Sequence, residues 1–211
     1  MTVYAPLRLH APSRRDAVVA PLPVVLAPMA GVTNAAYRQL CREQGAGLYV
    51  CEMITSRGLV VGDHKTKDML AFDPGETTRS VQLYGVDADV MADAARILAR
   101  DYAVDHIDLN FGCPVPKVTR KGGGGVLPYK RDRLRAIVRE TVRAADEFGV
   151  PVTIKTRIGI DAEHETFLDA GRIAQEEGAA AIALHGRTVQ QAYSGEADWE
   201  RIAELADAVD I

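Results

Sequence analysis

The stretch of the sequence with the clearest chemical potential reads DLNFGCPVPK and runs from Asp108 to Lys117. It ends a short apolar run and places Cys113 between Gly112 and Pro114, as in a tight bend. A cysteine with the ordinary pKa of about 8.5 is mostly protonated at neutral pH, so this thiol could act as a general acid. Nearby positive charge would favour a nucleophilic thiolate instead. A third interpretation is a small residue that is tolerated at a bend.

Other candidate residues share one position, the carboxyl end of an apolar run. Lys155 lies in TIKTRIG, where it could serve as a cation beside an anionic cofactor or extend to the rim beside Arg157. His185 in LHGRT could be a ligand or a hydrogen-bonded structural histidine. Gln82 in VQLYG would bury an amide that needs a partner, and the edge of a heteroaromatic ring is a suitable one. The same position is occupied by Pro28, Met29, Glu52 and Asn110.

Four consecutive glycines, Gly122 to Gly125, follow the cysteine. They lack the Lys-Ser/Thr ending of a phosphate-binding P-loop, so they indicate either a flexible loop or close backbone approach to a ligand. Basic residues are densest around them and form either a solvated helix face or a patch that attracts a phosphate backbone. These residues are Lys117, Arg120, Lys121, Lys130, Arg131, Arg133 and Arg135.

Alternating strand-like and helix-like segments must position these residues. Strands are predicted at 23–29, 47–54, 79–85, 104–110, 151–159 and 180–186. Helices are predicted at 34–45, 87–101, 131–148, 165–177 and 198–209. This alternation indicates a parallel sheet of the α/β class.

A doubly wound sheet and a (β/α)8 TIM barrel both fit that pattern. No G-x-G-x-x-G follows the first strand, and the unusual side chains gather at strand ends that meet at one mouth of a barrel. We therefore expect a TIM barrel truncated after about six β–α units, at 23–211, preceded by an N-terminal extension or small hairpin at 1–22. The alternatives are a barrel that a partner completes and a fold that is not closed; a fragment is favoured.

Composition narrows the class of protein. The 211 residues suit one domain, and no apolar run approaches the length of a membrane span. The sequence also lacks a basic segment followed by an apolar one near its start, so a cytoplasmic protein is expected. Three cysteines without a C-x-x-C pair predict neither disulfides nor a metal site. The net charge of −4 argues against indiscriminate nucleic-acid binding, although a local basic patch can coexist with it.

Several motifs together resemble one family. APMAGVTN, VQLYG, DLNFGCPVPKVTRKGGG, TIKTRIG and LHGRTVQQAYSGEADW occur in the order and spacing of the bacterial tRNA-dihydrouridine synthases, from about Val24 to Trp199. The resemblance implies a (β/α)8 barrel with FMN that reduces the C5=C6 bond of particular tRNA uridines to 5,6-dihydrouridine, using NADPH or NADH. Family members add two further strands, whose loops hold the FMN phosphate, and a helical C-terminal domain that holds tRNA. Both are expected to be absent from this sequence, and the full-length form is expected to be a monomer.

The resemblance also implies residue roles. Cys113 would be the acid and Asn110 would help to place the uracil. Flavin contacts would come from Pro28, Met29, Ala30, Gln82, Lys155 and His185. Two alternatives stay open: another FMN barrel that acts on a free pyrimidine or an enone, and a non-catalytic remnant or RNA-binding fragment.

Overall fold

Buried aliphatic runs form the strands on which the molecule is built. In the computed structural model, which describes residues 4–45 and 47–211, the longest are β6 (Ser80–Tyr84), β7 (His106–Phe111), β8 (Val152–Arg157) and β9 (Ala181–His185). Every residue of β7 is buried, as expected for a strand covered on both faces. The predicted α/β class is therefore confirmed.

The strands lie parallel in the order β5 (Ile54–Thr55), β6, β7, β8, β9, and β3 (Val25–Leu26) pairs with β4 (Leu48–Tyr49). A bridge between Val50 and Ser80 joins the two groups. The predicted strand at 47–54 is thus split into β4 and β5, because the chain leaves the sheet at 51–53. Within the described residues the parallel sheet stays open and no closed barrel forms, so the expectation of a truncated TIM barrel stays a prediction.

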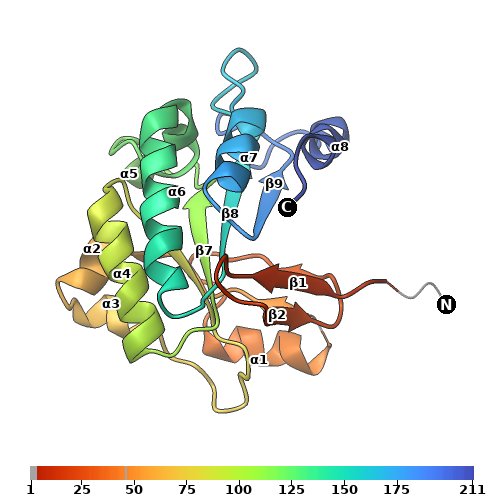
Figure 1. Ribbon diagram of the computed structural model, residues 1–211. Helices are drawn as coiled ribbons and strands as arrows, with labels where there is room; N and C mark the ends of the chain where they lie inside the picture. The colour runs from red at the N-terminus through yellow and green to blue at the C-terminus, as the bar shows by residue number, and fades with distance from the viewer. Residues whose placement is uncertain (1–3, 46) are drawn as a thin grey trace.

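Amphipathic helices cover the outer face of the sheet (Figure 1). They are α1 (Ala35–Glu43), α4 (Ala88–Asp101), α6 (Arg131–Asp146), α7 (Phe167–Glu176) and α8 (Trp199–Ala208). Alanines on α4 and α6, such as Ala95 and Ala144, are fully buried and let these two helices approach closely. No helix in the described part of the chain is long and apolar enough to cross a membrane.

Short elements that the sequence did not predict occupy the connections. They are α2 (Ser56–Val60), α3 (His64–Asp68), α5 (Pro116–Thr119) and the 3₁₀ helix η1 (Gly124–Tyr129). Each is too short to produce a recognisable helical period in a window of about 11 to 18 residues. The last two matter for the site, because they follow Cys113 directly.

An antiparallel hairpin covers the amino end of the sheet (Figure 1). Its strands are β1 (Leu7–His10) and β2 (Ala17–Ala20), inside the predicted segment 1–22, of which residues 1–3 lie outside the described residues. Leu9 and Ala20 pack with Leu48 and with the residues that begin β9. The hairpin therefore contacts the sheet at the end opposite to the predicted site.

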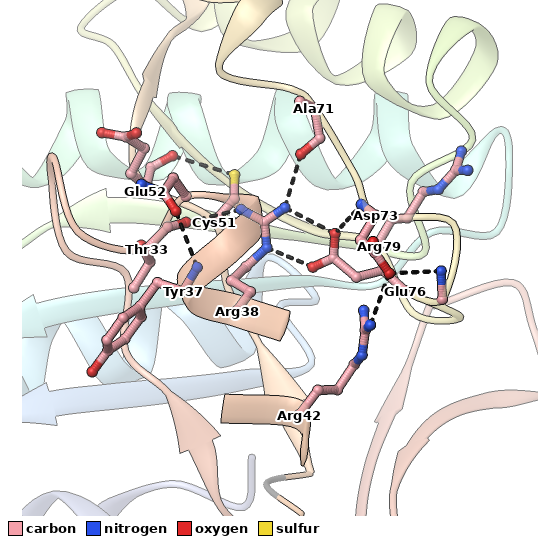
Figure 2. Close-up of polar contacts among 12 residues, drawn as sticks. Thr33, Tyr37, Arg38, Arg42, Cys51, Glu52, Ala71, Asp73, Glu76 and Arg79 are labelled. Atoms are coloured by element: carbon pink, nitrogen blue, oxygen red, sulfur yellow. Dashed lines mark hydrogen bonds and ion pairs between the residues drawn. The ribbon is translucent and has the colours of Figure 1, made fainter. Parts of the chain in front are cut away.

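Arg38, a buried residue of α1, anchors the connection between β3 and α1 (Figure 2). Its guanidinium donates to both carboxylate oxygens of Glu76, at 2.6 and 2.9 Å. Its other N–H groups donate to the carbonyls of Thr33 and Ala71, at 2.8 and 2.9 Å. A buried charge is tolerated only when it is paired and hydrogen-bonded, so this fork fixes α1 relative to the segment that precedes β6.

We predict that Arg38→Met lowers the free energy of unfolding by about 3–5 kcal/mol, because it leaves the Glu76 carboxylate buried without its partner. Urea denaturation measures the loss. The double variant Arg38→Met/Glu76→Leu should recover much of it, since no unpaired charge remains. A matched control is Arg100→Met, which breaks an exposed ion pair with Asp101 and should change stability little. Equal effects of the two single variants would contradict this account.

Candidate active site

One cavity of about 470 Å³ lies at the carboxyl ends of the strands. This volume is in the range of small-molecule and cofactor sites. Every site residue predicted from the sequence lines it: Pro28, Met29, Ala30, Gln82, Asn110, Cys113, Lys155 and His185. They come from β6, β7, β8, β9, the β3–α1 connection and the loop that follows β7, so the fold brings together side chains that are far apart in the sequence.

The β3–α1 connection forms one wall and is held by its own backbone. Thr33 donates its N–H to the Met29 carbonyl at 3.0 Å and accepts the Met29 N–H through its hydroxyl at 3.1 Å. Glu52 accepts the N–H of Gly31 at 2.7 Å, which ties this wall to the segment between β4 and β5. Because Arg38 holds the Thr33 carbonyl from behind, the wall is fixed on both sides (Figure 2).

Two amides form the floor of the cavity. Gln82 donates to the Asp108 carboxylate at 2.6 Å and accepts from Asn110 at 2.8 Å. Asn110 also donates to the Met53 sulfur at 3.3 Å. The three polar residues lie on one face because strand side chains alternate and these strands are in register. Their amides are thus held in place before any ligand binds.

The loop at 112–115, here called the Cys113 loop, lies above this floor. The side-chain oxygen of Asn110 accepts the backbone N–H groups of Gly112 and Cys113, at 3.2 and 2.9 Å. Arg157 donates to the Gly112 carbonyl at 2.8 Å. The half-buried thiol therefore lies on a loop that is hydrogen-bonded on two sides.

The glycine run packs directly against this loop. Gly125 donates its N–H to the Cys113 carbonyl at 3.0 Å. Gly124 has a φ of +59°, and a Cβ there would lie only 2.5 Å from the same carbonyl oxygen. Gly124 thus permits close approach of two backbone segments, a role that differs both from a flexible loop and from close approach to a ligand.

Positive charge gathers on the side of the cavity formed by β8 and β9. Burial lowers the pKa of Lys155, while the nearby Asp108 carboxylate raises it. Burial also lowers the pKa of Arg157, which contacts carbonyls and lies over the ring of Tyr193. Burial, with Arg157, Lys155 and Arg187 near, lowers the pKa of His185 to about 4, so this imidazole is neutral at pH 7. The wall therefore presents cations and a neutral histidine.

A second set of buried polar groups continues below the floor. His106, only 2% exposed, bonds Ser80 through Nδ1 at 2.7 Å and Thr153 through Nε2 at 2.9 Å. Thr153 donates to Asp108 at 2.6 Å. Burial lowers the pKa of His106 to about 3, so the ring stays neutral. Buried polar groups here satisfy one another, as they must in a low-dielectric interior.

Sequence reasoning did not assign roles to Arg157, Tyr193 and Met53, which also line the cavity. A signal existed for Arg157, since it follows Lys155 by two residues on the same strand and so shares its face. Tyr193 and Met53 come from irregular segments, where no period predicts direction.

The basic residues around the glycine run have two kinds of surroundings. Arg131 pairs with Asp169 and Arg135 pairs with acidic residues at the end of α7, so these two serve helix packing. Lys117 and Lys121 instead line a second cavity of about 350 Å³ beside the site.

The other cysteines differ from Cys113 in their surroundings. Cys51 is fully buried and donates to the Glu52 carbonyl, and burial raises its pKa to about 11. Cys41 lies on α1. Among the described residues, no group of three or more His, Cys, Asp or Glu side chains is arranged to hold a metal ion.

We predict that Gly124→Ala displaces the Cys113 loop, because the new Cβ would meet the Cys113 carbonyl. Gly122→Ala is a matched control: Gly122 also has a positive φ, +78°, but the nearest atom to its Cβ would be 3.9 Å away. Both variants should lose about 1–2 kcal/mol from the left-handed backbone. Only Gly124→Ala should change the rate at which iodoacetamide alkylates Cys113, read from the peptide that contains it. Equal alkylation rates in the two variants would argue against this packing role.

A pH dependence of stability follows from His106. Its pKa falls from 6.5 to about 3 on folding, so protons bind the unfolded chain first and stability is lost as pH falls below 6.5. We predict that His106→Gln removes this loss, which amounts to about 1.4 kcal/mol per pH unit between pH 4 and 6. Asp108 contributes a pH dependence of the opposite sign, because burial raises its pKa to about 6 and its contribution to stability grows as pH falls. Asp108 is present in both the original protein and His106→Gln, so the difference between them reports His106. Urea unfolding at several pH values measures the difference, and His10→Gln, on the exposed side of β1, should leave the slope unchanged.

Comparison with known proteins identifies one family. The dihydrouridine synthase family model matches residues 25–211. A probable tRNA-dihydrouridine synthase of Mycobacterium tuberculosis (strain ATCC 25618 / H37Rv) is 57% identical over 194 residues, covering 89% of this chain and 50% of the relative. The corresponding protein of Mycobacterium leprae (strain TN) is 51% identical over 211 residues, covering 88% of this chain and 55% of the relative.

A tRNA-dihydrouridine synthase B of Pseudomonas syringae pv. tomato (strain ATCC BAA-871 / DC3000) is 42% identical over 188 residues, which are 89% of this chain and 55% of the relative. The chain thus spans about half the length of the curated relatives it matches. With the family model covering residues 25–211, the chain belongs to the dihydrouridine synthase family.

Proposed function

We propose that this chain carries the reaction site of an enzyme that reduces the C5=C6 bond of specific uridines in tRNA to 5,6-dihydrouridine, with FMN as cofactor and NADPH or NADH as electron donor. The observation that carries the proposal is a single cavity that joins a half-buried thiol, a pair of fixed amides and an amine. Names of the relatives support the substrate class. The cytoplasm, where tRNA is modified, is the proposed location.

The residues of the cavity fit a flavin. Pro28, Met29, Val32 and Met53 give it apolar walls that suit a flat ring. The side-chain amine of Lys155 makes no hydrogen bond with any described residue, so it is available to an anionic ring edge or to a carbonyl. Gln82 uses one N–H and one lone pair within the protein, which leaves one of each for the pyrimidine edge of the ring. His185, neutral, completes this side.

Bound FMN would supply a hydride to C6 of the uracil. That addition leaves an electron pair at C5, and the Cys113 Sγ–H bond can break to give C5 its proton. The resulting thiolate regains a proton from solvent, so the step balances. One well-placed general acid raises the reaction rate roughly a hundred- to ten-thousand-fold. Lys155 would stabilise negative charge on the reduced cofactor and Arg157 keeps the loop that bears the thiol in place.

Asn110 serves the reaction first by holding the Cys113 loop. Its oxygen accepts two backbone N–H groups, and its N–H groups go to Gln82 and to the Met53 sulfur. A thioether is a weak acceptor, so the N–H that faces Met53 is the one that can pass to a uracil carbonyl. This is how Asn110 could help to place the base without releasing the loop.

The target uridine must leave its stack to reach a cavity of this kind. Extruding a base costs a few kcal/mol, which contacts to the RNA backbone must offset. Lys117 and Lys121 beside the Cys113 loop are suitably charged to make such contacts.

We predict that Cys113→Ala abolishes dihydrouridine formation while flavin binding persists, because the thiol is the proton donor and not a cofactor contact. Flavin absorbance of the purified protein and nucleoside analysis of the tRNA product give the two readouts. Cys41→Ala is the matched control, since Cys41 lies on α1 outside the cavity, and it should keep full activity. Near-normal turnover by Cys113→Ala would remove the thiol from the mechanism.

A further inference from the structure

A continuous chain of hydrogen bonds leads from the Cys113 loop into the interior. The N–H groups of Gly112 and Cys113 donate to the Asn110 oxygen. Asn110 donates to Gln82 at 2.8 Å, and Gln82 donates to Asp108 Oδ2 at 2.6 Å. Gln82, Asn110 and Asp108 are all buried, so a lost partner would leave a poorly solvated polar group.

The direction of this chain is fixed at its upper end. A backbone N–H can only donate, so the Asn110 oxygen must face the Cys113 loop and its NH₂ must face Gln82. Gln82 must then present its oxygen to Asn110 and its NH₂ to Asp108. It follows that Asp108 Oδ2 has to accept. Reversing any link would set two donors or two acceptors against each other.

A second branch reaches the same carboxylate and has no such constraint. Thr153 donates to Asp108 Oδ1, and its hydroxyl also contacts His106, which contacts Ser80. Since the only proton of the Thr153 hydroxyl goes to Asp108, the His106 Nε2 must donate and Nδ1 must accept from Ser80. Hydroxyls rotate and a neutral imidazole has two tautomers, so this whole branch can run in either direction.

We propose that Asp108 is a positioning residue whose carboxylate oxygen Oδ2 is the required acceptor at the end of the one-way chain through Gln82 and Asn110. It thereby fixes which atoms Gln82 presents to the cavity and where Cys113 lies. The part that concerns turnover rests on the proposed function; the part that concerns the loop does not.

The surroundings of Asp108 support this role. Residues of β1, β3, β4 and β9 that line the adjoining cavity are apolar, and the titratable groups that face Asp108 are Lys155 and the neutral His106. Burial raises the pKa of Asp108 to about 6, so the group is mainly ionised at pH 7. When Asp108 is protonated, the proton can lie on Oδ1, and the hydrogen bonds through Thr153, His106 and Ser80 can all reverse direction. Oδ2 then remains an acceptor for Gln82.

Three variants separate an acceptor requirement from a general need for the network. Asp108→Leu removes the acceptor at similar size. Asp108→Asn keeps an acceptor for Gln82 only if its NH₂ faces Thr153, which forces the second branch to reverse. Thr153→Val removes the other hydrogen bond to the same carboxylate and leaves the one-way chain intact.

We expect Asp108→Leu to raise the alkylation rate of Cys113 by about tenfold, the factor that corresponds to about 1.4 kcal/mol. It should also lower kcat for dihydrouridine formation more than it changes KM for tRNA. Asp108→Asn should restore the alkylation rate and move the proton of His106 from Nε2 to Nδ1, which ¹⁵N NMR of the imidazole detects. In Thr153→Val, Cys113 should be alkylated at the same rate as in the original protein.

If Cys113 of a folded Asp108→Leu variant were alkylated at the same rate as in the unaltered protein, the proposal would be overturned. A His106 proton that stays on Nε2 in Asp108→Asn would also overturn it, a readout that decides the matter even if Asp108→Leu does not fold. Release of the loop by Thr153→Val would show that the network as a whole is needed. If the unaltered protein forms no dihydrouridine, the proposed function fails, while the alkylation and tautomer results still test the chain.

Discussion

Asn110 accepts the N–H groups of Gly112 and Cys113, and this pair of bonds sets how the rest of the site is arranged. Because the Asn110 oxygen accepts from the Cys113 loop, the Asn110 NH₂ needs an acceptor in a buried environment, and Gln82 is that acceptor. The Gln82 NH₂ in turn needs an acceptor, and the ionised Asp108 carboxylate, which can only accept, supplies it. The loop that bears the thiol is thus connected to the centre of the sheet by partners that each need the next.

Two buried arginines hold the walls in a comparable way. Arg38 spreads its guanidinium over Glu76 and the carbonyls of two loop segments. Arg157 donates to the carbonyls of Gly112, Thr188 and Ala192, which joins the Cys113 loop to the segment after β9. The rigid fork of donors suits both tasks. The two arginines differ in how their positive charge is compensated. Arg38 forms an ion pair with Glu76, whereas among the described residues Arg157 contacts only neutral oxygens and an aromatic ring.

The sequence allowed the α/β class and the gathering of the site residues to be predicted, because strand ends of a parallel sheet meet at one edge. The period of two explains why Lys155 and Arg157 share a face. Other features depend on tertiary contact and leave no local signal. Arg38 and Glu76 are 38 positions apart, and nothing near either of them predicts the pair. The glycine run suggested close backbone approach to a ligand, but the structure places Gly124 against the Cys113 backbone, and no local pattern predicts that partner.

The balance of charge in the cavity explains why an anionic ligand suits it. Burial pushes each ionisable group toward its neutral form: the pKa of Asp108 rises, and the pKa values of Lys155 and Arg157 fall. Lys155 and Arg157 line the cavity, whereas Asp108 does not line it, faces only Lys155 of the two and already accepts hydrogen bonds from Gln82 and Thr153. The wall of the cavity therefore keeps a positive excess. An anion bound near Lys155 would offset the desolvation of the amine and raise its pKa again. The cations are therefore stabilised most fully by a ligand, whereas Asp108 is satisfied by the protein, and this division leaves the floor of the cavity rigid while its wall responds to what binds.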